Sequence, residues 1–197
     1  MNMGDLLNYQ SDKKTIVELL ENGIHFSPYL LRDFNIAKGE YFPAIVQSHT
    51  SKVYMMSWGI DNYNQSLTLT QIYFKSFEKQ SSLKKLLVNN RILIPVNQLM
   101  QNKDEYKPEL VIRSKENNIL YMAGIWKENE DGSLGFAIIT KDVTEEYSSK
   151  IRRIPLFITS REDIATWLKK DTKIINELNY FLKKKVDVEI LHDIILV

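Results

Sequence analysis

The stretch Met55-Met56-Ser57-Trp58-Gly59-Ile60 ends an apolar run in a tryptophan that a glycine follows directly. Glycine reaches backbone angles that are closed to other residues, so the chain can turn sharply after Trp58. The turn would leave the indole either packed at the end of a buried strand or exposed as a platform on which a flat ring can stack. Both interpretations of Trp58 are open at this point.

The segments around this stretch predict a series of short strands. Residues 43–46 and 52–57 are β-prone runs separated by the polar residues 48–51, which favours a hairpin that leads into Trp58. Residues 110–114 and 119–126 are expected to form a second hairpin around Glu116-Asn117-Asn118. Further strands are expected at 91–96, 134–140 and 154–159, with a last one within 186–197.

Helices are expected between these strands, at residues 11–23, 81–90, 142–150 and 160–185. Ser160 is the expected N-cap of the last one, with Asp163 as an acidic residue of its first turn. Helices and strands do not alternate regularly, which counts against a doubly wound nucleotide-binding fold. The predicted fold class is α+β with a curved, mostly antiparallel sheet.

Length and composition limit the class of protein. With 197 residues, the chain is expected to form one domain that buries a substantial core. There is no cysteine, which removes disulfides and thiolate zinc sites and fits a reducing compartment, so a cytoplasmic location is expected. No apolar run is long enough for a membrane span. The net charge of +1 does not by itself indicate a nucleic-acid-binding protein.

The residue types that carry common reactions are not arranged for them. The glycines form no phosphate-binding loop, and His25, His49 and His192 are too far apart in sequence for a metal-type pair. No serine, histidine and carboxylate set follows from spacing. Neither a metal nor a cofactor is therefore expected, and the residues alone predict a domain without an identifiable reaction.

A series of short segments follows the order and spacing of motifs in one known family. These segments are Asn35-Ile36-Ala37 with Pro43, Met56-Ser57-Trp58-Gly59-Ile60, Ser82-Leu83-Lys84, Arg91-Ile92-Leu93-Ile94-Pro95, Met122-Ala123-Gly124-Ile125-Trp126, residues 136–140, Arg153-Ile154-Pro155 and Trp167-Leu168. They resemble motifs of the SOS response-associated peptidase (SRAP) family. The resemblance implies a single SRAP-like domain over 1–197, with a curved sheet or partial barrel and inserted helices.

The resemblance also implies a reaction that this chain lacks the residues to perform. Members of the family capture abasic sites in single-stranded DNA through a cysteine after the initiator methionine, where this chain has Asn2. The family's Asn-Ala-Arg-x-Glu segment falls on Tyr73-Phe74-Lys75-Ser76-Phe77, and its catalytic glutamate falls on Gln101, which cannot act as a general acid or base. Its histidine falls where Ser148 and Ile151 stand. The expectation is a catalytically degenerate member.

The DNA-binding surface is expected to be kept better than the chemistry. Trp58 is the expected stacking residue, and Lys75, Lys84 and Arg153 are the expected phosphate contacts. The expected partner is single-stranded or abasic DNA, bound without a durable cross-link.

Two alternatives remain open. The first is a protein-interaction module that kept the fold, in which Tyr73, Phe74 and Phe77 fill the old site. The second is a divergent enzyme in which the Met1 α-amine or Lys75 forms a Schiff base with the aldehyde of an abasic site. Lys75 would need a lowered pKa for that role.

Overall fold

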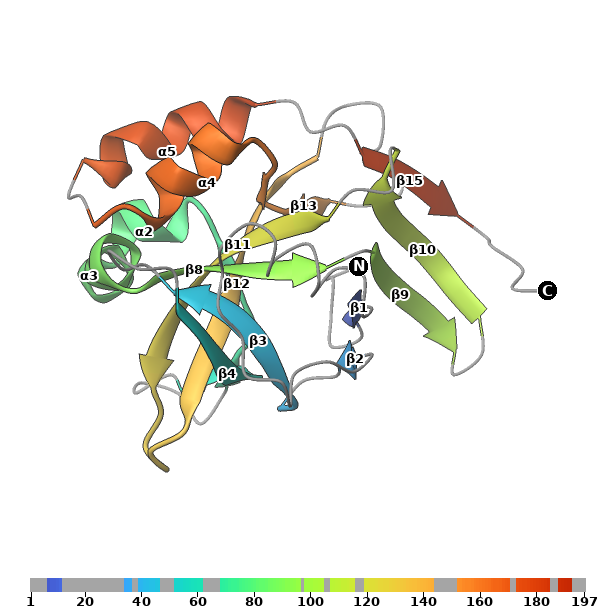
Figure 1. Ribbon diagram of the computed structural model, residues 1–197, viewed down its shortest axis with the longest axis horizontal. Helices are drawn as coiled ribbons and strands as arrows, with labels where there is room; N and C mark the ends of the chain where they lie inside the picture. Colours follow the sequence, from blue (N-terminus) through green and yellow to red (C-terminus); the bar gives the residue numbers. More distant parts are fainter. Residues whose placement is uncertain are drawn as a thin grey trace.

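The central feature of the fold is a closed barrel of five β-strands, which we call the ring. The computed structural model describes residues 7–11, 34–36, 39–46, 52–61, 68–96, 98–104, 107–115, 119–143, 152–170, 173–184 and 188–192 (Figure 1). The ring consists of β3 (Tyr41–Val46), β4 (Lys52–Trp58), β8 (Arg91–Val96), β11 (Leu120–Glu128) and β12 (Leu134–Asp142). Its strands lie in the order β12-β4-β3-β8-β11, and the pairing of β11 with β12 closes it.

Short strands extend the ring at the C-terminal end of β12. There β7 (Gln71–Tyr73) runs parallel to β12, and β13 (Arg153–Pro155) runs antiparallel to it. The next strand, β14 (Phe157–Ile158), pairs with β11, so the segment from β13 to β14 bridges β12 and β11. Apart from the pairings of β12 with β4 and β7, the described strand pairs are antiparallel, which confirms the predicted α+β class and the mostly antiparallel sheet.

Two hydrophobic clusters form the core because successive residues of a strand face opposite sides. One cluster takes residues from all five ring strands, among them Phe42, Met56, Ile94, Met122 and Phe136. The other joins the opposite faces of the ring strands to the helices.

Gly124 lies at a crowded place in the ring, next to Ile94 of the first cluster, and it fits there because it has no side chain. A Cβ on this residue would lie 2.9 Å from both the carbonyl oxygen of Ala137 and the Cδ1 atom of Ile94. The glycine therefore lets β8, β11 and β12 come close together.

A second sheet lies beside the ring, at the right of Figure 1, in the order β15-β10-β9-β1-β2. Its strands are β1 (Leu7–Ser11), β2 (Phe34–Ile36), β9 (Gln98–Asp104), β10 (Lys107–Ser114) and β15 (Val188–His192). The predicted hairpin of 110–114 with 119–126 is wrong, because β10 pairs with β9 and β15 while β11 pairs with strands of the ring. The strand β11 is almost wholly buried and needs a neighbour on both edges, whereas β10 exposes Arg113. A small two-stranded sheet joins β5 (Ile60–Asp61) to β6 (Thr68–Leu69).

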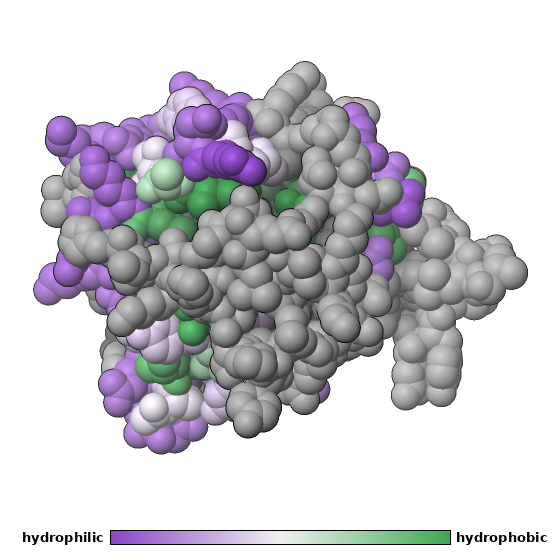
Figure 2. Space-filling model, viewed as in Figure 1, coloured by the Kyte–Doolittle hydropathy of each residue, from purple (hydrophilic) through white to green (hydrophobic). Residues whose placement is uncertain are grey.

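The described helices cover one side of the ring, at the upper left of Figure 1. They are α2 (Ser76–Lys79), α3 (Ser81–Asn89), α4 (Arg161–Leu168) and α5 (Ile174–Lys183). Figure 2 shows hydrophilic side chains gathered over this layer, with hydrophobic ones beneath them. In the described part of the chain, no helix has the length and apolar character needed to cross a membrane.

The helix predictions hold in part. The helix predicted at 81–90 is α3, and Ser160 caps α4, with its Oγ accepting a hydrogen bond from the Asp163 backbone N–H at 3.1 Å. The single helix predicted over 160–185 is instead two helices, because α4 ends at Leu168 and the next residue is extended. Ser11 ends β1 rather than capping a helix, and the rest of the helix predicted at 11–23 lies outside the described residues.

Arg91 explains why α4 stops where it does. Its side chain is fully buried and donates from Nε to the Trp167 carbonyl at 2.6 Å and from Nη2 to the Lys169 carbonyl. The Nη1 atom donates to the carbonyls of Leu87 and Val88 at 2.7 and 2.9 Å. These carbonyls belong to the last turns of α3 and α4, where the helix itself supplies no donors. One guanidinium therefore holds the ends of two helices against β8.

Candidate functional site

The candidate site lies where β7, β12 and β13 meet. Tyr73 of β7 is the register partner of Thr140, and Arg153 of β13 is the register partner of Asp142. Because residues two apart in a strand face the same side, Tyr73, Asp142 and Arg153 share one face. Lys75 follows Tyr73 two residues later, just before α2 begins.

Lys75, Asp142 and Arg153 each contact Tyr73, and we call these four residues the Tyr73 cluster. The Tyr73 hydroxyl donates a hydrogen bond of 2.5 Å to Oδ2 of Asp142, and the Lys75 ammonium lies 3.8 Å from the same oxygen. The Arg153 guanidinium carbon lies 3.8 Å from the centre of the Tyr73 ring, and the Lys75 ammonium 5.5 Å from it. Two cations thus lie close to one aromatic ring, and one carboxylate accepts the hydrogen bond of its hydroxyl.

The cluster is open to solvent. The side chains of Lys75 and Asp142 are 55% and 54% exposed, Arg153 is exposed, and Tyr73 is half-buried. Exposed groups at this spacing can contact an anion without first breaking a buried ion pair.

The charge state of Lys75 follows from its neighbours. A hydrogen bond with Tyr73 raises the pKa of the Lys75 ammonium, and the negative charges of Asp142 and Glu78 add to this, while desolvation opposes it. Lys75 is therefore protonated at neutral pH. A lysine that forms a Schiff base needs the opposite shift, because only the neutral amine is a nucleophile.

Aromatic residues fill the space beside the cluster. Phe74 packs edge-on against Tyr73, with ring centres 4.9 Å apart, and the Lys75 ammonium lies 5.6 Å from the Phe74 ring. Phe77 of α2 is buried in the core. The segment on which the family's Asn-Ala-Arg-x-Glu motif falls therefore supplies aromatic packing and one cation.

Trp58 is a packing residue in this structure. Its side chain is 1% exposed, and its indole N–H donates to the Thr70 carbonyl at 2.9 Å. Gly59 has a φ of +143°, and a Cβ there would clash with a methyl carbon of Thr68, so the turn after Trp58 requires glycine. The stacking interpretation of Trp58 is corrected, because no face of the indole is open to a base.

The other predicted residues lie apart from the cluster or outside the described residues. Lys84 is exposed on α3, and none of the described contacts of the Tyr73 cluster reaches it. Gln101 lies in β9, where its backbone pairs with Leu7 and Leu110, but its side chain is outside the described part. Asn2 and Ile151 lie outside the described residues altogether, as do Met1 and Ser148.

Asp142 is the site residue that the sequence analysis missed. Its segment was expected to be helical, whereas Asp142 is the last residue of β12. Its place beside Tyr73 depends on the register of β12 with β7 and β13, which the local sequence does not specify.

Among the described residues, no group of three or more His, Cys, Asp or Glu side chains could hold a metal ion. The Tyr73 cluster offers a cationic and aromatic surface suited to contacts with phosphate groups and flat rings.

Neighbouring Lys141 anchors this end of β12 from the opposite face. Its ammonium donates to the carbonyls of Leu182 and Lys184 at 3.2 Å each, at the C-terminal end of α5. Burial lowers the pKa of the Lys141 ammonium. The strand that carries Asp142 is thus fixed to the helix layer.

Comparisons with known proteins agree on the fold. A phage-related protein from Bordetella bronchiseptica matches with 16% identity over 94% of this chain and 92% of that chain, at a TM-score of 0.71. A protein from Bacteroides thetaiotaomicron matches with 17% identity over 94% of this chain and 90% of that chain, at a TM-score of 0.74. Another protein from Bordetella bronchiseptica matches with 13% identity over 97% of this chain and 100% of that chain, at a TM-score of 0.71. No protein of curated function matches. A model of the SOS response associated peptidase (SRAP) family matches residues 7–192, and the chain therefore belongs to the SRAP family.

Proposed function

We propose that this SRAP protein binds single-stranded DNA, abasic DNA included, without forming a covalent bond, and that it does so in the cytoplasm. The Tyr73 cluster is the proposed contact face. The observation that carries the proposal is the placement of two exposed cations, Lys75 and Arg153, beside the half-buried ring of Tyr73. Tyr73 and Lys75 belong to the segment on which the family's Asn-Ala-Arg-x-Glu motif falls, and Arg153 to the segment that resembles its Arg-Met-Pro motif.

The physical basis is the chemistry of a nucleic-acid strand. Lys75 and Arg153 are fixed cations that attract phosphates, with release of counterions as each phosphate is neutralised. The Tyr73 ring and the planar Arg153 guanidinium are surfaces on which a base can stack in any sequence context. Phe74 supports the Tyr73 ring from its side.

The absence of a covalent step follows from the residues at the reactive positions. Asn2 carries an amide where the family's reaction needs a thiol, and an amide does not form a thiazolidine. The raised pKa of Lys75 keeps it protonated, which suits a phosphate contact and opposes a Schiff base.

Fluorescence anisotropy with a labelled single-stranded oligonucleotide tests the proposal. We expect binding at low salt, with a slope of log affinity against log salt of about −0.7 for each phosphate contacted. Lys75→Gln and Arg153→Gln should each weaken binding about threefold to tenfold and reduce the slope by about 0.7. Lys170→Gln, at an exposed lysine beyond α4, is the matched control and should bind like the wild type. Absence of binding by the wild type at low salt would overturn the proposal.

The protein-interaction alternative is favoured by one observation. Phe74 and Phe77 occupy part of the segment where the family's catalytic groups stand, and Asp142 offsets the charge of Lys75. A folded wild type that fails to bind DNA at low salt would support this alternative. Borohydride trapping on an abasic oligonucleotide addresses the enzyme alternative, because a covalent adduct would support a Schiff base at Met1 or Lys75.

A further inference from the structure

Asp142 occupies the centre of the Tyr73 cluster. Its Oδ2 atom accepts the hydrogen bond of the Tyr73 hydroxyl at 2.5 Å and lies 3.8 Å from the Lys75 ammonium. Its backbone register partner is Arg153, whose guanidinium lies on the Tyr73 ring. The Asp142 carboxylate therefore lies close to Lys75 and holds the hydroxyl of the ring on which Arg153 is stacked.

The hydrogen bond gives Asp142 a positioning role. The Tyr73 ring has Arg153 on its face and Phe74 at its edge, and its hydroxyl is fixed by the Asp142 carboxylate. A carboxylate acceptor makes a stronger hydrogen bond than a neutral one, so Asp142 limits the rotation of the ring and of the cation stacked on it. Removing the acceptor should loosen this arrangement.

The negative charge gives Asp142 a second and opposing role. A phosphate that contacts Lys75 must approach the carboxylate that lies 3.8 Å from the same ammonium. Like charges at such distances repel, and the repulsion is screened as the ionic strength rises. Glu78 also bears on Lys75 electrostatically, but it lies on α2 and has no described contact with Tyr73.

We propose that Asp142 is a positioning residue that also acts as an internal counter-ion, competing with nucleic-acid phosphate for Lys75. It orients the aromatic ring and at the same time limits the affinity of the Tyr73 cluster for single-stranded DNA. This inference rests on the proposed function of the same site.

The two roles separate in two substitutions. Asp142→Asn keeps an oxygen that accepts from the Tyr73 hydroxyl but removes the charge, whereas Asp142→Ala removes both. Anisotropy with a single-stranded oligonucleotide at low salt should show about fivefold tighter binding for Asp142→Asn, falling towards the wild-type value at high salt. Asp142→Ala should gain less than Asp142→Asn, because the ring is no longer held.

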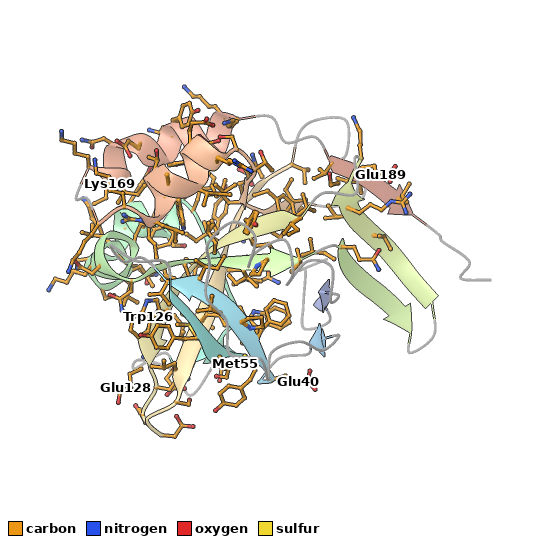
Figure 3. All side chains as sticks on the ribbon, viewed as in Figure 1. Glu40, Met55, Trp126, Glu128, Lys169 and Glu189 are labelled. Atoms are coloured by element: carbon orange, nitrogen blue, oxygen red, sulfur yellow. The ribbon has the colours of Figure 1, made fainter. Side chains whose placement is uncertain are left out.

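Glu128→Gln is the matched control, because it changes the net charge equally at an exposed residue. Glu128 lies at the end of β11, at the lower left of Figure 3 and away from β13. The Glu128→Gln variant should bind DNA like the wild type. Thermal unfolding should show that all three variants fold, since the Asp142 side chain is half exposed.

The outcomes separate the two proposals. If the wild type binds through Lys75 and Arg153 but Asp142→Asn binds no more tightly, the counter-ion role is overturned and the DNA-binding proposal stands. An equal gain in Glu128→Gln overturns it as well, because the effect would then be one of net charge. If neither the wild type nor Asp142→Asn binds at low salt, both proposals fail.

Discussion

At the scale of single residues, Arg91 shows how one buried charge can organise a fold. Its guanidinium donates to carbonyls at the C-terminal ends of both α3 and α4 and lies near the Trp167 ring. The indole N–H of Trp167 in turn donates to the Ile92 carbonyl at 2.9 Å. The planar fork of arginine reaches several acceptors at once, which a lysine cannot do.

Replacing Arg91 should therefore destabilise the protein strongly. Arg91→Met leaves the helix-end carbonyls buried without donors, and we expect the free energy of unfolding to fall by ~3–5 kcal/mol. Urea unfolding followed by circular dichroism measures this. Arg113→Met, at an exposed arginine of β10 paired with Glu189, should cost less than ~1 kcal/mol. Equal losses in the two variants would contradict the role given to Arg91.

Single residues also show where sequence reasoning about the site reaches its limit. The position of Arg153 beside Tyr73 and Lys75 could be anticipated only through the resemblance, because β13 is far from β7 in sequence. The burial of Trp58 and the place of Asp142 depend on strand register, which local composition does not specify.

At the scale of elements, α4 and α5 are joined by a polar group at their ends. Asp163 is buried, forms an ion pair with Lys184 and accepts a hydrogen bond from the Tyr180 hydroxyl at 3.2 Å. Burial raises the pKa of the Asp163 carboxyl. The hydrogen bond and charge of Lys184, together with hydrogen bonds from Ser160 and Tyr180, outweigh the effect of burial and leave the pKa below its ordinary value. The hydrogen bond with Asp163 raises the pKa of Lys184.

These shifts predict how stability depends on pH. The contribution of Asp163 is present above the unfolded pKa of about 3.9 and is lost as pH falls through its lower folded value. The contribution of Lys184 to stability is present below its unfolded pKa of about 10.4 and is lost as pH rises through its higher folded pKa. Asp163→Asn should reduce the stability at neutral pH by ~1–3 kcal/mol and flatten its decline in acid, as measured by urea unfolding at a series of pH values. Glu162→Gln, at an exposed neighbour, should leave the acid limb nearly unchanged; a matching flattening would refute the assignment.

Elements with strong local signals were predicted well. The hairpin of β3 and β4, the helix α3 and the cap of α4 follow from alternation, helical spacing and a serine at the right place. The polar strand β9 could not be predicted, because it forms through pairing with β1 and β10. The break between α4 and α5 could not be predicted either, because it depends on the hydrogen bonds of Arg91 to the end of α4.

At the scale of the whole molecule, closure of the ring depends on close contact between strands. Gly124→Ala would place a methyl group 2.9 Å from a backbone oxygen of β12 and from Ile94 of β8. We expect the free energy of unfolding to fall by ~1–3 kcal/mol, because the backbone oxygen of Ala137 cannot move without disturbing β12. Thermal and urea unfolding measure this, and unchanged stability would show that the ring is less crowded at Gly124 than described.

The closed ring also has a consequence for the order in which the chain is synthesised. The strands β3, β4, β8 and β11 all precede β12, which supplies the pairings that close the ring. Until residues 134–142 have left the ribosome, β4 and β11 each present an unpaired edge, and such edges are templates for association between nascent chains. A ribosome that pauses before β12 would therefore hold the chain with both of these edges unpaired.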